Sequence, residues 1–522
     1  FWQTAEKKRV NDSGVRIGGA DLSPVTQLFT ENYMVRFLLE NSLGAWWAAR
    51  HPESPLVGAW EYLRRNEDGT PAAGTFSEWP ERAAEVTVMD PCCGSGHFLV
   101  AMFGMLWRMR AEEEGLTPAE AQDAVLRDNL HGLELDPRCT QIATFNVALE
   151  SWKQGGFRDL PAPRIVCSGV PVRSSRTEWE AQSGDDDELR QVLGRLHSLF
   201  RNADSLGSLI APRPADLGDA LFGTDLSIGA NWESVRVALA RALAGEKQEQ
   251  AVLGHAADDV VHAAGLLSES YVLVATNPPF LSSAKQADVL RNFVRDADRV
   301  AAGNLAYSML SRWSNSTTRA FVVPQSWRYQ TNYSSFRMAR LALNGPMLVA
   351  ALGVSGFSAT MWDFHTDLLV EGGQQSEAIS GVDVAAGKSP SEVAALLVSE
   401  PLSITTREQQ WANTDHRITL TSSKHQALLS ALASGLQGIK TGDDGRYRRC
   451  FWEVEGVGGP RWQRFLTSVS STNFYAGRSL VVAWDEGRGP MAHSRGSRIV
   501  GKAAWGKLGV LVSQMGNLPV TV

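Results

Sequence analysis

The chain lacks several features that would assign it to a particular class of protein. No run of 18 apolar residues occurs among its 522 residues, so we expect no membrane-spanning helix. The first residue is Phe1 rather than Met, and no secretory signal pattern follows it. The five cysteines are odd in number, and none forms a Cys-x-x-Cys pair with the spacing of a zinc site. We therefore expect a cytoplasmic protein with reduced thiols, no bound metal and no membrane partner.

Length and composition indicate a globular protein of more than one domain. The hydrophobic content of 43% and the charged content of 20% are ordinary values for such proteins. No internal repeat is visible. The chain starts at Phe1 and stops inside an apolar run at Val522, so we expect both ends to be cuts in a longer protein.

Charge is distributed unevenly along the chain. The net charge is −7, which is unusual for a protein that binds nucleic acid. Residues 436–522, however, hold 12 Lys and Arg against 6 Asp and Glu, a net charge of +6, so the remaining residues carry −13. A basic module with interleaved aromatic residues suits phosphate contacts and base stacking. The alternative interpretation is an ordinary solvated face with buried tryptophans.

A four-residue turn, Asn277-Pro278-Pro279-Phe280, directly follows an apolar run at residues 271–275 that reads as a buried parallel strand. Ligands bind at the carboxyl ends of strands in open α/β sheets. The Asn277 side-chain oxygen and the Pro278 carbonyl can both accept hydrogen bonds from one exocyclic amine, while the two prolines fix the backbone. Phe280 offers a flat face for a planar ring. The alternative is a proline-rich loop in which Asn277 only forms the turn.

A second turn lies upstream, between a short β-rich run at residues 86–89 and a helical pattern. Its sequence, Asp-Pro-Cys-Cys-Gly-Ser-Gly-His-Phe, spans residues 90–98. Gly94 and Gly96 allow the backbone to approach a ligand closely, although the third glycine of a dinucleotide fingerprint is missing. The next expected strand, residues 130–134, ends in Glu134, which can accept hydrogen bonds from two ribose hydroxyls.

In this order the motifs resemble those of γ-class DNA methyltransferases, which transfer a methyl group from S-adenosylmethionine to an adenine amine. The resemblance implies that the Asp90 turn holds the methionine part of the cofactor and that Glu134 holds its ribose. It implies that the Asn277 turn holds a flipped adenine, and Asn rather than Ser in the first position favours adenine over cytosine. The catalytic residues it implies are Asn277, Pro278, Pro279 and Phe280. The cofactor-binding residues it implies are Thr30, Asp90, Pro91, Cys92, Gly94, Gly96, Phe98, Glu134, Asp136, Asp204 and Asn277.

Two of these positions have alternative interpretations from the residues alone. Thr30 resembles the hydroxyl of the Phe-Thr segment that covers the cofactor, but it could simply cap a helix. Asp204 resembles the acid that contacts the cofactor's adenine, but it could be an ordinary turn residue. Asn304 stands where the family usually has an acid, which puts one supporting contact in doubt.

Within the class, roughly residues 20 to 510 look most like the PglX-type methyltransferases of BREX phage-defence systems. Adenine methylases of DISARM systems and type IIG restriction–modification enzymes are related to them. Some type IIG relatives carry a fused nuclease, and no convincing Pro-Asp and Glu-x-Lys pair is present here.

The expected fold is α/β: a Rossmann-like, S-adenosylmethionine-dependent methyltransferase sheet followed by a mixed α/β target-recognition module. We expect a helical N-terminal region at residues 1–85 and a catalytic domain at 86–375. That domain should contain a helical insertion at about residues 175–265. Residues 376–435 read as a connector, and residues 436–522 as the start of the target-recognition domain.

The expected function is site-specific N6-adenine methylation of double-stranded DNA, with other defence-system proteins as further partners. The DNA-binding candidates are Arg446, Arg448, Arg449, Arg461 and Arg464. Two alternatives remain open. One is a methyltransferase acting on protein glutamine or RNA, because the Asn277 turn also fits a glutamine amide; the other is a methylase-like recognition subunit without turnover.

Overall fold

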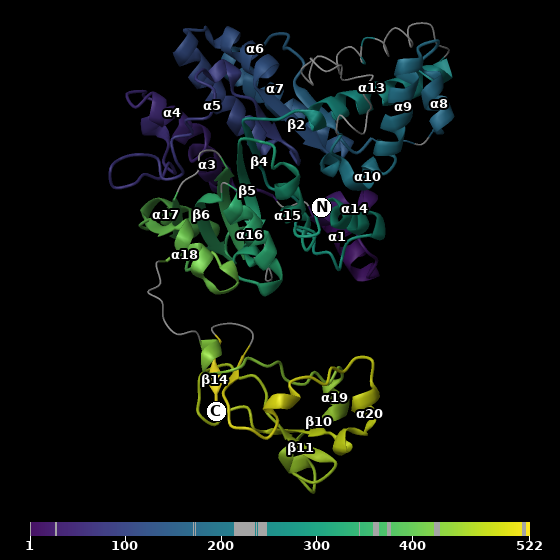
Figure 1. Ribbon diagram of the computed structural model, residues 1–522, viewed down its shortest axis with the longest axis vertical. Coiled ribbons are helices and arrows are strands. Elements are labelled where there is room, and N and C mark those ends of the chain that lie inside the picture. Colours follow the sequence, from purple (N-terminus) through teal and green to yellow (C-terminus); the bar gives the residue numbers. More distant parts are fainter. Residues whose placement is uncertain are drawn as a thin grey trace. The chain divides into compact units, whose positions relative to one another are not determined.

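The computed structural model describes residues 2–26, 29–170, 172, 174–212, 235, 237, 248–343, 345–358, 365–372, 377–421, 429–513 and 518–522. The chain divides into two compact units, Phe1–Ser422 and Ser423–Val522 (Figure 1). None of the described helices is long and apolar enough to cross a membrane.

The first unit is built around a nine-stranded sheet with the strand order β3-β2-β1-β4-β5-β7-β6-β8-β9. The first five strands of that order run parallel, and β7 pairs antiparallel with both β5 and β6. The strands are β1 (Val88–Asp90), β2 (Leu130–Glu134), β3 (Arg164–Cys167), β4 (Leu273–Thr276), β5 (Thr318–Pro324), β6 (Pro346–Gly353), β7 (Thr366–Gly372), β8 (Ala378–Asp383) and β9 (Ser403–Thr406). The chain order reverses between β1 and β4, and the crevice at such a switch point is where doubly wound sheets bind ligands.

Helices cover both faces of this sheet. Successive strand residues point to opposite faces, and the central strands are buried throughout, so both faces are apolar and need a cover. Val88 packs in one apolar cluster, whereas its neighbour Met89 packs in the other. The helices of the first face are α3 (Asn32–Glu40), α4 (Leu43–Arg50), α5 (His97–Glu114), α6 (Pro118–Asp128), α7 (Pro137–Gly155) and α17 (Pro390–Ser399). Those of the second face are α9 (Asp187–Phe200), α10 (Ala203–Leu206), α13 (Gln248–Ser268), α14 (Asp288–Ala297), α15 (Leu305–Arg312) and α16 (Ser334–Ala342). The expected α/β architecture is confirmed.

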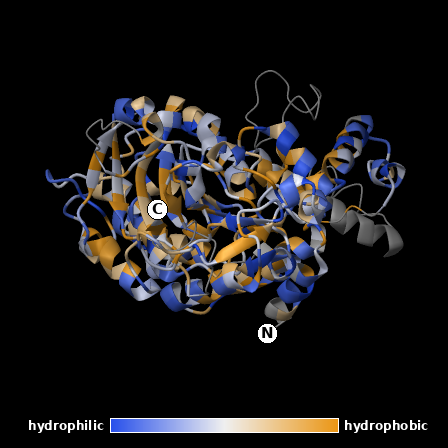
Figure 2. Ribbon diagram, turned by 90° about the horizontal axis from the view of Figure 1, so that it is seen from below, coloured by the Kyte–Doolittle hydropathy of each residue, from blue (hydrophilic) through white to orange (hydrophobic). Residues whose placement is uncertain are grey.

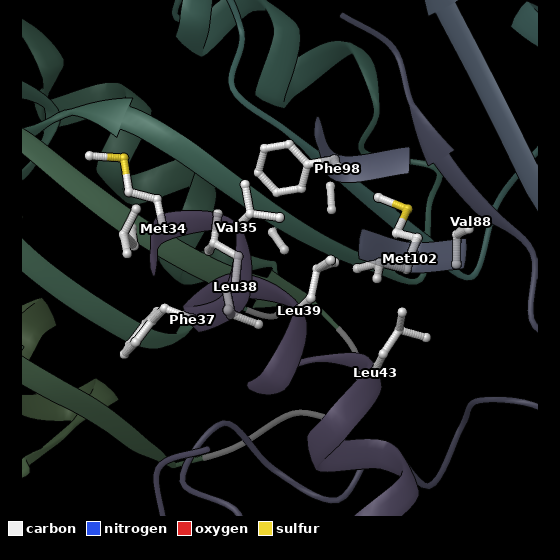
Figure 3. Close-up of a cluster of buried hydrophobic side chains, with 14 of the residues drawn as sticks. Met34, Val35, Phe37, Leu38, Leu39, Leu43, Val88, Phe98 and Met102 are labelled. Atoms are coloured by element: carbon white, nitrogen blue, oxygen red, sulfur yellow. The ribbon is translucent and has the colours of Figure 1, made fainter. Parts of the chain in front are cut away.

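The N-terminal helices belong to the sheet's core rather than to a separate domain. Figure 3 shows Val35 and Leu39 of α3 beside Val88 of β1 and Phe98 and Met102 of α5. These five side chains are at most 2% exposed. Phe98 lies in the first turn of α5, directly after the glycine-rich turn, and its burial anchors that end of the helix in the apolar core.

The helical insertion between β3 and β4 is present in the described residues. It contains α8 (Arg176–Ala181), α9, α10 and α13, and the apolar faces of α9 and α13 pack in the second cluster. Figure 1 shows α8, α9 and α13 grouped at one side of the unit. Most of the expected insertion from residue 213 to residue 247 lies outside the described residues.

The interpretation of residues 376–435 as a connector is wrong for residues 378–412, which form strands and helices of the first unit. β8 and β9 extend the sheet, and α17 buries Val393 and Leu397 against it. A second helix, α18 (Arg407–Ala412), follows β9. The Ser- and Gly-rich composition suggested a loop. In the structure, Ile379 and Val382 of β8 pack in the two apolar clusters on opposite faces of the large sheet.

The second unit is small and β-rich. Its antiparallel sheet has the order β10-β12-β11, and β13 and β14 form a separate pair. The elements are α19 (Asp444–Tyr447), β10 (Arg448–Cys450), β11 (Trp462–Phe465), β12 (Leu480–Ala483), α20 (Pro490–His493), β13 (Leu511–Val512) and β14 (Val520–Thr521). Tyr447, Val482 and Met491 form its apolar core. Figure 2 colours the chain by hydropathy: many strands are orange, that is hydrophobic, and many helices carry both orange and blue residues.

Candidate active site

A pocket of about 650 Å³ lies at the switch point of the large sheet. Segments after β1, β2 and β4 line it, together with residues before α3 and the turn after α10. Nine of the sequence-predicted residues line the pocket: Thr30, Asp90, Pro91, Cys92, Gly94, Phe98, Glu134, Asn277 and Pro279. The structure thus brings together residues that are far apart in the chain, as the motif order predicts.

Glu134 holds the glycine-rich turn in place from the end of β2. One carboxylate oxygen accepts the Gly94 N–H at 2.7 Å, and the other accepts the Asp136 N–H at 3.0 Å. Gly94 has a φ of +54°, a conformation that favours glycine. Burial raises the pKa of Glu134, and the backbone donors oppose that shift. Each carboxylate oxygen retains a lone pair, so Glu134 can still accept hydrogen bonds from ligand hydroxyls.

Asp90 ends β1 and is 1% exposed. Its carboxylate accepts the Cys92 N–H at 3.1 Å, which closes the start of the turn. Burial raises the pKa of Asp90 to about 7, and the nearby Glu134 charge adds to the shift. Two acids in one buried pocket favour a cationic ligand, because a positive charge would offset their desolvation.

Asn277 lies at the end of β4 and faces the segment that precedes α3. Its side-chain amide donates to the Thr30 hydroxyl at 3.0 Å, whereas its side-chain oxygen is buried and has no partner among the described residues. The N-cap position of α3 belongs to Glu31, so Thr30 does not cap that helix. An unpaired buried acceptor costs about 1–3 kcal/mol, so the site is prepared for an incoming donor.

Other predicted site residues do not line the pocket. Gly96 instead allows α5 to approach α7, because a Cβ there would lie 3.1 Å from the Ala143 Cα. Asp136 caps α7 and pairs with Arg138 at 2.6 Å. Asp204 is exposed on α10, although residues 205–209 beside it line the pocket.

The catalytic turn is also partly withdrawn from the pocket. Pro278 is buried and does not line the cavity. Phe280 is 6% exposed and packs in the apolar cluster that contains α3 and α5. Its predicted role as a stacking surface therefore requires the turn to expose the ring when a base enters.

Several lining residues escaped the sequence interpretation. They are Lys7, Leu22, Pro24, Cys139, Ile142, Ser208, Leu305 and Met309. Cys139 and Ile142 occupy the first turns of the helix after Glu134, a position that could have indicated them. The others come from elements whose placement depends on the tertiary fold. Asn304, the departure from the family pattern, caps α15 through the Ala306 N–H at 3.1 Å.

The five arginine candidates of the second unit have different environments. Arg449 and Arg464 both lie opposite Val481, so they share one face of the small sheet, and both are exposed. Arg448 lies opposite Val482 on the other face, pairs with Asp444 at 2.9 Å and covers the Phe465 ring. Arg446 and Arg461 are exposed beside the rings of Tyr447 and Trp462 respectively.

The described residues offer neither a disulfide nor a metal-binding cluster for the cysteines. No cluster of His, Cys, Asp or Glu that could hold a metal occurs among the described residues. All five cysteines are free thiols, and burial raises the pKa of Cys92 well above its usual value. A protonated thiol is a poor nucleophile.

Sequence comparison with known proteins gives two extended matches. The chain is 25% identical over 480 residues to the adenine-specific methyltransferase PglX of Lacticaseibacillus casei (strain Zhang), covering 84% of this chain and 38% of that protein. The chain is similar to PglX-type adenine-specific methyltransferases. BrxX, an adenine-specific methyltransferase of Escherichia coli O9:H4 (strain HS), is 24% identical over 383 residues, which cover 66% of this chain and 30% of BrxX. The resemblance predicted from the motifs is thus confirmed, and the chain spans less than two fifths of the length of these relatives.

Two solved structures with a similar fold are named as restriction–modification proteins. The type IIL restriction–modification enzyme MmeI, solved in complex with DNA, is 13% identical with a TM-score of 0.43, covering 91% of this chain and 55% of MmeI. The M protein of the type I restriction enzyme EcoKI is 12% identical with a TM-score of 0.32, covering 70% of this chain and 52% of that protein. No family model matches the chain.

Proposed function

We propose that the chain is the catalytic part of a site-specific DNA methyltransferase that uses S-adenosylmethionine to methylate adenine at N6. The observation that carries this proposal is the buried, unpartnered side-chain oxygen of Asn277 in the pocket that Asp90 and Glu134 line. The similarity to PglX and BrxX, both adenine-specific methyltransferases, supports the proposal.

The residues of the pocket fit the proposed cofactor. Its volume of about 650 Å³ lies within the usual range for small-molecule sites. Glu134 can accept hydrogen bonds from ribose hydroxyls, and Asp90 offers a negative charge to the cationic groups of the cofactor, its sulfonium and its ammonium. When bound, S-adenosylmethionine supplies an activated methyl group on a sulfonium, which is a good leaving group.

The chain's own contribution is to position the acceptor amine. Asn277 would accept one amine hydrogen through its side-chain oxygen, and the Pro278 carbonyl would accept the other. Thr30 holds the Asn277 amide so that its oxygen is the end available to the ligand. Orientation of this kind supplies a large share of the rate enhancement of an enzyme. The transfer needs no strong base, because the amine attacks a methyl group that already carries a good leaving group.

Double-stranded DNA is the proposed substrate, so the adenine must leave the helix before it reaches the pocket. Unstacking costs on the order of a few kcal/mol. Phe280 would stack on the extruded base once its ring is exposed. The basic second unit would supply phosphate and base contacts.

We place the protein in a bacterial phage-defence or restriction–modification system in the cytoplasm, with other defence proteins as partners. The similarity to PglX and BrxX, which are named adenine-specific methyltransferases, supports this assignment.

The proposal is tested by offering labelled S-adenosylmethionine to the protein with duplex DNA, structured RNA or a glutamine-containing protein. We expect label in DNA only. Transfer to RNA or to glutamine would instead identify another acceptor with the same amine geometry, and cofactor binding without transfer to any substrate would indicate a recognition subunit.

A further inference from the structure

An N-terminal segment, residues 2–26, contributes three residues to the lining of the pocket; we call it the strap. It consists of α1 (Trp2–Ser13), a connecting turn and α2 (Leu22–Thr26). The connecting turn includes η1 (Gly19–Asp21), which packs against α10, and α10 in turn packs against α14. The sequence did not predict that the strap belongs to the site, because the strap ends before the first motif residue, Thr30.

The strap is tied to the loop that follows the catalytic turn. The Ile17 N–H donates to the Lys285 carbonyl at 2.7 Å, and the Ile17 carbonyl accepts the Ala287 N–H at 2.7 Å. Arg16 and Asp288 form an ion pair at 2.5 Å. These contacts fix the strap against the same unit that carries Asn277.

The strap also reaches the insertion and the pocket itself. Gly19 lies beside α10, since a Cβ there would be 3.6 Å from the Ser205 hydroxyl. Lys7, Leu22 and Pro24 line the pocket. The strap therefore contributes one charged and two apolar side chains to the cavity that holds Asp90 and Glu134.

Lys7 is the one Lys or Arg among the described residues that line the pocket. It forms no ion pair within the described part of the chain, whereas its neighbours Glu6 and Arg9 pair with each other. His97 also lines the pocket, but burial lowers its pKa, so it is neutral near pH 7. The charges of the pocket are thus two acids and one unpaired cation.

We propose that Lys7 binds the carboxylate of the cofactor's methionine end. The inference rests on the proposed function, because it assigns the anionic group of that same ligand. S-adenosylmethionine carries two cationic groups, its sulfonium and its ammonium, and one carboxylate. Asp90 and Glu134 complement the positive and hydroxyl-bearing parts, which leaves the carboxylate for Lys7. A charge-assisted hydrogen bond of this kind is stronger than a neutral one.

Decarboxylated S-adenosylmethionine, which keeps both cationic groups and lacks the carboxylate, tests this assignment. Binding of each ligand is measured by calorimetry without DNA, using the whole chain and the variants Lys7→Met, Lys7→Arg and Lys8→Met. Lys8 is the matched control, because it is exposed on the same helix and does not line the pocket. Lys7→Met should weaken S-adenosylmethionine about tenfold, as expected for the loss of one charged hydrogen bond. It should leave the decarboxylated ligand within about twofold, and Lys7→Arg should retain most of the affinity.

The outcomes separate the inference from the function on which it rests. Equal weakening of both ligands by Lys7→Met, or none, would overturn the role of Lys7 while leaving the methyltransferase intact. Unchanged cofactor binding with weaker DNA binding would also overturn it and assign the cation to a phosphate. Failure of the unaltered chain to bind either ligand would overturn the proposed function together with the inference.

Discussion

The side-chain amide of Asn277 donates a hydrogen bond to the hydroxyl of Thr30 at 3.0 Å, across 247 positions of sequence. The bond joins the turn after β4 to the segment that precedes α3. Because it occupies the nitrogen end of the amide, it leaves the oxygen end buried and unpaired. The two residues therefore form one unit in which the Asn277 side-chain oxygen stays available as an acceptor.

Thr30→Val should lower kcat for DNA methylation about tenfold, because the Asn277 amide loses the partner that orients it. Thr30→Ser keeps the hydroxyl and should retain most of the rate. The measurement is steady-state methyl transfer, with circular dichroism to check folding. Equal rates for the valine and serine variants would show that the hydrogen bond does not orient Asn277.

Cofactor affinity should depend on pH through Asp90, whose pKa burial raises to about 7. The ionised carboxylate attracts the cationic ligand, so affinity should fall as pH drops below 7, by a factor approaching tenfold per unit. Titrations between pH 6 and pH 8.5 measure the effect. Asp90→Asn should bind weakly and lack this pH dependence, and a dependence that persists in the variant would assign it to another group.

The same shift has the opposite sign for the stability of the ligand-free protein. The pKa of Asp90 rises from 3.8 to about 7 on folding, so its stabilising contribution is complete below pH 3.8 and is lost as pH rises through 7. Asp90→Asn should therefore raise the Tm of the free protein at pH 8 while it weakens cofactor binding. A lower Tm of Asp90→Asn at pH 8 would contradict this, because it would mean that the hydrogen bond to the Asp90 carboxylate stabilises the protein by more than the burial of its charge costs.

Glu134→Gln should loosen the glycine-rich turn, because the Gly94 and Asp136 N–H groups bond to different carboxylate oxygens and one of them would then face an amide NH2 group, which cannot accept. We expect at least tenfold weaker cofactor binding and a loss of about 1–3 kcal/mol in unfolding free energy. Glu150→Gln, a change on the outer part of α7, is the control and should fall within about 0.5 kcal/mol of the unaltered chain. Similar behaviour of the two variants would contradict the role of Glu134.

The face that Arg449 and Arg464 share should contact DNA. Each change to Ala should weaken binding to all sequences and reduce the salt dependence by about one phosphate contact. Arg448→Ala should mainly destabilise the second unit, since Arg448 pairs with Asp444 and covers Phe465. Binding isotherms at several salt concentrations check this, and equal salt slopes for all three variants would refute the assignment of faces.

Much of the fold follows from local pattern. The expected strand at residues 130–134 coincides with β2, and the expected strand at residues 271–275 overlaps β4, because both runs are short and are followed by turn residues. β8 and β9 were missed. The edge strand β9 is mostly Ser and Thr, and the buried strand β8 holds Ser380 and Gly381 at its centre, so neither strand gives a clear apolar pattern.

The site was predictable where a motif places backbone and side chain together, as for Asp90, Glu134 and Asn277. It was not predictable where tertiary packing decides. Phe280 turns into the core, and Lys7 reaches the pocket through a helix that carries no motif. Gly96 satisfies the motif for a different reason, the close approach of α5 and α7.

The most direct test is methyl transfer from labelled S-adenosylmethionine to duplex DNA by the unaltered chain and by Asn277→Ala, with partner proteins added if the chain alone is silent. The account predicts label on adenine N6 with the unaltered chain. It predicts that transfer is abolished in the variant, while cofactor binding persists. Label on another base, or transfer that survives the loss of the Asn277 side chain, would contradict it.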